Sequence, residues 1–151
     1  MQCADIADVI EMLNTRSYSE LIRLPTFEDR LKYLLLFGAV GSDTFGHDRY
    51  LNQEFYRSRE WRRCRDAVII RDLGCDLAIP DRIIFGQLHV HHINPISEHA
   101  LLHGSETLFD MDNLVLVSHA THNAIHYGDL SSVLATEPIV RRPNDTIPWK
   151  E

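Results

Sequence analysis

The most informative part of this chain reads LHVHHINP at residues 88–95, NLVLV at 113–117 and SHATHNAIHYG at 118–128. The first two stretches are short and rich in apolar residues, and proline ends the first, so each predicts a β-strand. In the third, a serine suited to cap a helix precedes ten residues that end in glycine, where a helix should stop. The predicted order is strand, long irregular segment, strand and helix.

Histidines are concentrated in this region, because His47 is the only one of the nine that lies outside residues 89–126. Neutral imidazole is the commonest protein ligand for divalent transition metals, and it also titrates near neutral pH. His122 and His126 are four residues apart, so on a helix they share one face and can bind one cation. The pattern predicts a metal site with a base beside it, which favours hydrolytic chemistry.

A further ligand has to come from another element. If the helix folds back across the strands, the end of the first strand lies opposite it and offers His91 and His92. Adjacent residues of a strand point to opposite sides, so one can bind the metal while the other addresses the substrate. His89 shares a strand face with His91, but we do not expect it to reach the site. His119 is an alternative ligand on the helix, although a surface position is favoured.

With these motifs, residues 65–129 resemble the HNH endonucleases of the ββα-metal (His-Me finger) superfamily. The resemblance implies an α+β fold whose ββα-metal core is flanked by N-terminal helices. We divide the chain into a helical N-terminal scaffold at 1–56, the nuclease core at 57–130 and an extended C-terminal tail at 131–151. Because 151 residues bury one core rather than two, these parts should form one compact domain overall.

The resemblance also implies a role for each matching residue. His91 would be a metal ligand and His92 the general base. Asn113 would brace the loop and orient that base by hydrogen bonding. His122 and His126 would complete the site around one divalent metal ion, and imidazole ligands leave Zn, Mn, Ni, Co and Mg open. Many relatives add two Cys-x-x-Cys pairs that bind structural zinc, whereas here only Cys75 lies near that position.

The activity implied by the resemblance is hydrolysis of DNA phosphodiester bonds to 5′-phosphate and 3′-hydroxyl ends. Longer phrases are similar to the small HNH proteins of tailed bacteriophages, among them Thr44–Gly46, Arg71–Leu77 and Asn144–Trp149. Such proteins resemble partners of the packaging terminase. The implied partners are therefore double-stranded DNA and the phage large terminase, in genome processing or packaging within the cytoplasm of the bacterial host.

The net charge of -7 argues against a protein that coats nucleic acid. One segment is nevertheless basic, with arginines at 57, 59, 62, 63, 65 and 71 against acids at 60 and 66. It is either a phosphate-binding surface or a solvated helix face with internal ion pairs, and the sequence favours neither. Arg63 and Arg71 are the candidates for DNA binding.

The remaining segments give coarser predictions. Apolar residues at helical spacing predict helices at 4–13, at 27–36 after a Thr26 cap, and at 52–66. Short strands are predicted at 68–70 and 83–85, and a loop at 38–46. The N-terminus carries acids where a signal peptide would be basic, and no apolar run approaches the roughly 20 residues of a membrane span. We expect a soluble intracellular protein without membrane contact.

Two other functions stay open. The first is a non-catalytic packaging accessory that binds DNA or the terminase without cutting. The second is a structural zinc module, which is disfavoured because closed structural sites use cysteines and four protein ligands. Replacement of His92 would leave the activity of the first unchanged, which separates it from a nuclease.

Overall fold

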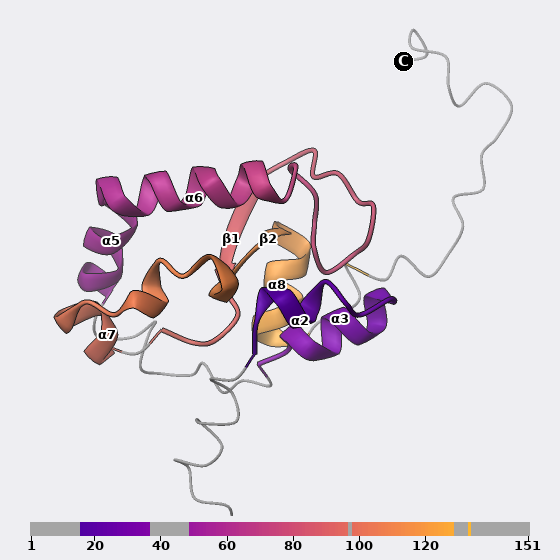
Figure 1. Cartoon of the computed structure of the whole chain (residues 1–151), viewed down its shortest axis with the longest axis horizontal. Coiled ribbons are helices and arrows are strands. Elements are labelled where there is room, and N and C mark those ends of the chain that lie inside the picture. Colours follow the sequence, from indigo (N-terminus) through magenta and orange to yellow (C-terminus); the bar gives the residue numbers. More distant parts are fainter. Residues whose placement is uncertain (1–15, 37–48, 97, 129–132, 134–151) are drawn as a thin grey trace, which may run out of the picture.

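The computed structural model describes residues 16–36, 49–96, 98–128 and 133 (Figure 1). In chain order its elements are α2 (Tyr18–Leu21), α3 (Phe27–Leu34), α5 (Arg49–Arg57), α6 (Arg59–Arg71), β1 (Leu88–His92), α7 (Glu98–His103), the 3-10 turns η1 (Glu106–Leu108) and η2 (Met111–Asn113), β2 (Leu114–Ser118) and α8 (His119–Tyr127). The described part is thus a mixed α+β structure. The helix predicted at 4–13 and the loop predicted at 38–46 lie outside the described residues.

The centre of the fold is the antiparallel pair β1 and β2, in which Leu88 is opposite Ser118 and His92 opposite Leu114. Helix α8 follows β2 directly. The hydroxyl of Ser118 accepts a hydrogen bond from Thr121 N, and Gly128 ends the helix in the left-handed conformation with a φ of 71°. Both residues satisfy backbone groups that a helix end would otherwise leave unpaired. Both predicted strands and the predicted helix are therefore confirmed, with boundaries within one residue.

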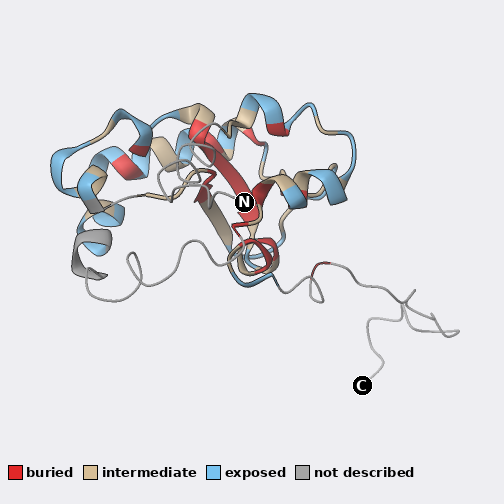
Figure 2. Cartoon of the chain, turned by 90° about the horizontal axis from the view of Figure 1, so that it is seen from below, coloured by how far each residue is buried: buried red, intermediate tan, exposed pale blue. Residues whose placement is uncertain are grey.

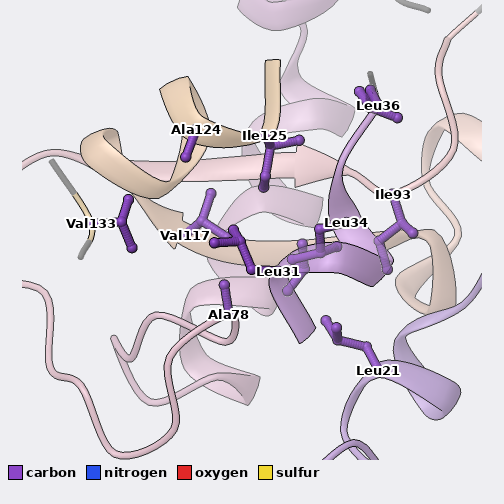
Figure 3. Packing of buried hydrophobic residues seen from close by; sticks show 11 residues of the cluster. Leu21, Leu31, Leu34, Leu36, Ala78, Ile93, Val117, Ala124, Ile125 and Val133 are labelled. Atoms are coloured by element: carbon purple, nitrogen blue, oxygen red, sulfur yellow. The ribbon is translucent and has the colours of Figure 1, made fainter. Parts of the chain in front are cut away.

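Each face of the two-stranded sheet packs on different helices (Figure 1). On one face, Val115 and Val117 belong to a cluster with residues of α3 and α8, namely Leu31, Leu34, Ala124 and Ile125 (Figure 3). On the other face, Leu114 and Leu116 pack with Trp61 and Val68 of α6. All four β2 positions from 114 to 117 have no exposed surface, and buried residues line the centre of the molecule in Figure 2.

This burial is the main force that fixes the strand and the three helices around it. Full burial of a leucine or valine side chain contributes about 1.5–3 kcal/mol, before the entropy cost of ordering the chain is subtracted. The N-terminal helices take part directly, since Leu21, Leu31 and Leu34 are all at most 3% exposed. They hold α8 against the sheet and so fix the position of its histidines. No helix of the described segments is both long and apolar enough to cross a membrane.

The outer edge of β2, which faces away from β1, is hydrogen-bonded by the segment that ends α6 and follows it. Four outward backbone groups form hydrogen bonds there, with donor–acceptor distances of 2.7–3.1 Å. The carbonyls of Leu114 and Leu116 accept from Arg71 Nη2 and Leu77 N, respectively. The amides of Leu116 and Ser118 donate to Asp72 Oδ2 and Asp76 Oδ2, respectively. Asp76 Oδ2 also accepts from Thr121 Oγ1 at 2.6 Å, which ties the first turn of α8 to the same carboxylate. The two aspartates are 5% and 1% exposed.

Two strand predictions before β1 are wrong. Residues 68–70 lie in the last turns of α6, and 83–85 form only an isolated bridge between Cys75 and Ile83. The β-branched run was a misleading signal, because Val68 lies seven residues after Trp61 and so packs on the same face of one helix. Tertiary burial of that face outweighs the weak strand preference of the run.

The predicted helix at 52–66 is broken into two. Ser58 accepts a hydrogen bond from Trp61 N and begins α6, which separates it from α5. The helix after Thr26 ends at Leu34 rather than at residue 36, because Leu35 has a ψ of 132° and so leaves the helical conformation. The segment between the strands is less irregular than expected, since it contains α7 and both 3-10 turns.

Candidate metal centre

Three predicted ligands meet between β1 and α8. His91, His122 and His126 each offer a ring nitrogen, and these atoms all lie within 4.8 Å of one another. The ring of His91 stands nearly perpendicular to both helical rings, at centroid distances of 5.5 Å to His122 and 5.2 Å to His126. The cluster could therefore hold a metal ion, as the spacing of these residues predicted.

A direct sign that the cluster suits a cation is the Nε2 atom of His91, which is buried and has no hydrogen-bond partner. An unsatisfied buried polar atom costs about 1–3 kcal/mol, so folded proteins rarely retain one without a function. A metal ion would satisfy it when His91 adopts the tautomer with the lone pair on Nε2, because neutral imidazole nitrogen binds Zn²⁺ and similar ions through that lone pair. The donor set of three imidazoles thus fits a divalent transition metal.

The electrostatics of the cluster favour the neutral imidazoles that metal binding needs. Burial, and then the neighbouring rings of His126 and His122, hold the pKa of His91 well below its usual range. Burial and the positive charge of His126 lower the pKa of His122 to about 4, and burial also lowers the pKa of His126. At neutral pH a cation would not have to displace protons from these rings.

His92 points to the opposite face of the sheet. Its ring is stacked on Trp61 of α6 at a centroid distance of 5.3 Å and an angle of 20°, with Phe55 at 6.2 Å. Leu108 O accepts a hydrogen bond from His92 Nε2 at 3.0 Å, so the proton is on Nε2 and the lone pair on Nδ1. Burial lowers the pKa of His92 to about 4, which keeps the ring neutral at pH 7.

Asn113 braces the loop between the strands. Its Oδ1 accepts hydrogen bonds from Asn94 N at 2.9 Å and Asn94 Nδ2 at 2.8 Å, and its Nδ2 donates to Thr107 O at 3.1 Å. The expected hydrogen bond that orients His92 is provided by the carbonyl of Leu108 instead of by this amide. Thr107 directly precedes Leu108, so Asn113 binds the residue next to the one whose carbonyl accepts from His92.

The two arginine candidates have different environments. Arg71 binds Asp72, Met111 O and Leu114 O within the protein, and its guanidinium carbon lies 3.5 Å from the ring centroid of Tyr18. All three of its nitrogens have protein partners, so a phosphate would have to compete with these bonds for the guanidinium. Arg63 is exposed on α6, as a DNA contact requires.

Two histidines that the sequence did not place in the site lie against it. The ring of His89 is stacked on His122 at 4.9 Å and 21°. His119, an exposed residue at the start of α8, shares a hydrogen bond of 3.2 Å with His89. The signal for His89 was its strand face, which it shares with His91 because strand side chains alternate.

Searches of family models, curated proteins and solved structures find no match to this chain. The case for a function therefore depends on the geometry of the site.

Proposed function

We propose that the protein is a metal-dependent DNA endonuclease of the HNH type, with β1, β2 and α8 as a ββα-metal core. The observation that carries the proposal is the cluster of three imidazoles in which His91 Nε2 is buried without a partner. A closed structural zinc site would use four protein ligands, often cysteines. Three histidines leave a coordination position for water or substrate, as a catalytic site requires.

A divalent cation held by His91, His122 and His126 would supply Lewis-acid stabilisation of the charge that develops on the phosphodiester and its leaving 3′-oxygen. The chain's own contribution is His92. Its Nδ1 carries the lone pair and would take a proton from the attacking water, while the bond from Nε2 to Leu108 O fixes the ring. The rings of Trp61 and Phe55 pack against His92, which is 6% exposed. Attack at phosphorus would leave 5′-phosphate and 3′-hydroxyl ends.

Duplex DNA is the proposed substrate because the exposed side of α6 is basic. Arg59, Arg62 and Arg63 are exposed on this helix. Burial, then His119 and then Arg65 lower the pKa of His89, so Arg65 adds positive charge near that imidazole. The exposed arginines of α6 could neutralise phosphates of a bound duplex. The proposed role is genome processing or packaging with a phage large terminase, in the cytoplasm of the bacterial host.

One observation favours the second candidate, an accessory that binds DNA or the terminase without cutting it. His92 is only 6% exposed, so a substrate reaches its ring only if α5, α6 or the loop at Leu108 moves. The net charge of -7 also fits a chain that acts together with a basic partner.

Conversion of supercoiled plasmid separates the two functions. Purified protein should nick or linearise plasmid with Mn, Ni, Co, Zn or Mg, and EDTA should abolish this. His92→Ala and His91→Ala should both be inactive, whereas His103→Ala, which changes an exposed histidine of α7, should cut like the wild type. If the folded wild type binds metal and cuts under none of these conditions, the accessory function replaces the nuclease.

A further inference from the structure

A second group of polar side chains adjoins the three-histidine cluster on the side of His122. His89 on β1 and His119 on α8 approach each other with His89 Nε2 and His119 Nδ1 3.2 Å apart. Asn123, one turn further along α8, places its Nδ2 3.2 Å from His119 Nε2. Strand and helix are thus bridged by a hydrogen-bonded array that ends on the ring next to a proposed metal ligand.

With the Asn123 amide as donor, the hydrogen bonds of this array assign one tautomer to the neutral ring of His119. An amide N–H donates, so His119 Nε2 accepts from Asn123 and carries the lone pair. His119 Nδ1 therefore carries the hydrogen and donates a hydrogen bond to His89 Nε2. His119 Nδ1 and His89 Nε2 are both used in this hydrogen bond, so neither nitrogen is free to bind the cation.

The contact between His89 and His122 connects this hydrogen-bonded array to the three-histidine cluster. The two rings are stacked at a centroid distance of 4.9 Å with only 21° between their planes. The imidazole of His122 could rotate about its Cβ–Cγ bond. Such a rotation would move its ligating nitrogen away from His91. The stacked His89 ring restricts that rotation, and His119 in turn fixes His89.

We infer that His89 and His119 are positioning residues that hold the ring of His122 in the orientation that binds the metal ion. The inference rests on the proposed metal centre and adds two residues to it. They take no part as ligands. Partners of metal-binding histidines usually fix the ring through a hydrogen bond to its second nitrogen. Here the stacked ring of His89 would fix His122 before the ion arrives and so reduce the entropy lost on binding.

The test is a Co²⁺ titration of the full chain, with the dissociation constant and the visible absorption spectrum of the bound ion as readouts. His89→Ala should weaken binding by about three- to tenfold, as expected for loss of an aromatic contact, and should alter the spectrum. His89→Phe retains a ring against His122 and should restore most of the affinity. His119→Ala should give a smaller loss, because His89 keeps its stack but loses its hydrogen bond.

Matched controls come from α7, where His99 and His103 form another pair of rings, 4.5 Å apart and both exposed. Alanine at either position should leave affinity and spectrum unchanged. Wild-type affinity and spectrum in folded His89→Ala would overturn the inference, and so would His89→Phe binding as weakly as His89→Ala. If His89→Ala does not fold, the Co²⁺ affinity of His119→Ala tests the inference instead. His119 is exposed, so its replacement should not prevent folding.

Failure of the metal centre itself has a different signature. If the wild type binds Co²⁺ no better than His91→Ala, both the centre and the inference fall. If His91→Ala and His122→Ala lose binding while His89→Ala and His119→Ala keep it, only the inference falls.

Discussion

The side chains of His91 and His92 leave β1 on opposite faces of the sheet, so two consecutive residues belong to separate environments. His91 faces His122 and His126 of α8, whereas His92 is stacked on Trp61 of α6. The alternation of a strand produces this separation without any special backbone conformation. The proposed metal binding and the proposed proton transfer should therefore respond to different substitutions.

The first prediction concerns the ligands. Alanine in place of His91, His122 or His126 should weaken binding of a divalent metal by more than about 100-fold, since changes at the partners of ligands already cost up to about this much. Competition with a chromophoric chelator measures the loss, and His103→Ala is the control. An unchanged affinity in any of the three would remove that residue from the proposed centre.

His92→Ala should separate cutting from metal binding. Loss of a general base lowers the rate by roughly 100- to 10,000-fold, while the affinity for metal should stay within a factor of two or so, because His92 lies on the other face. Single-turnover plasmid nicking and the chelator assay on the same preparation test both statements. Equal losses of both would indicate that the substitution disturbs β1 as a whole.

The third prediction is a pH dependence of stability in the metal-free protein. An unfolded histidine takes up a proton near pH 6.5, but burial holds the pKa of folded His92 at about 4. Between these values the unfolded state binds more protons, so stability is full above about pH 6.5 and falls as the pH drops toward about 4. For His92 alone the loss reaches about 3 kcal/mol, at about 1.4 kcal/mol per pKa unit.

Urea denaturation with EDTA at several pH values between 4.5 and 7.5 measures this loss. Carboxyl groups also titrate near the acid end of the range, so the comparison with His92→Phe isolates the histidine. The variant should show a shallower fall than the wild type. Parallel curves would contradict the assignment of His92 as a buried neutral imidazole.

Arg71 and Arg63 should behave differently although both are arginines of α6. Arg71→Ala should cost about 2–4 kcal/mol of unfolding free energy, because it removes several bonds to a carboxylate and to buried carbonyls. Arg63→Ala should leave stability unchanged and weaken DNA binding with a smaller salt dependence, as for loss of a phosphate contact. Thermal melts and DNA titrations at two salt concentrations measure these changes. The reverse pattern would restore Arg71 to the DNA interface.

Asp76→Ala should be among the most destabilising single changes. Its carboxylate accepts bonds from Ala78 N, Ser118 N and Thr121 Oγ1 at 1% exposure, so removal leaves several buried donors without partners, at about 3 kcal/mol or more. Denaturant unfolding measures the loss, with the exposed Asp66→Ala as control. A loss below about 1 kcal/mol would mean that water replaces the carboxylate.

The predictable part of this molecule was the part with strong local signals. Ser118 and Gly128 mark the two ends of α8, and the apolar run specifies β2. The i, i+4 spacing of His122 and His126 needs only a helix to become a cluster. Residues whose role depends on a distant contact were not predictable. Arg71 binds an edge of β2 that lies more than 40 residues away in sequence, and the carbonyl that fixes His92 belongs to a segment predicted to be irregular.

The closed outer edge of β2 has a consequence for association between molecules. Exposed strand edges present unpaired amide and carbonyl groups that recruit strands from other chains, and this is a common start of aggregation. Here Arg71, Asp72, Asp76 and Leu77 already occupy the outward groups of Leu114, Leu116 and Ser118. A strand from a second molecule cannot pair on this side unless the segment after α6 detaches. Substitutions at Arg71 or Asp72 would therefore lower solubility through the exposed edge, even where the fold survives.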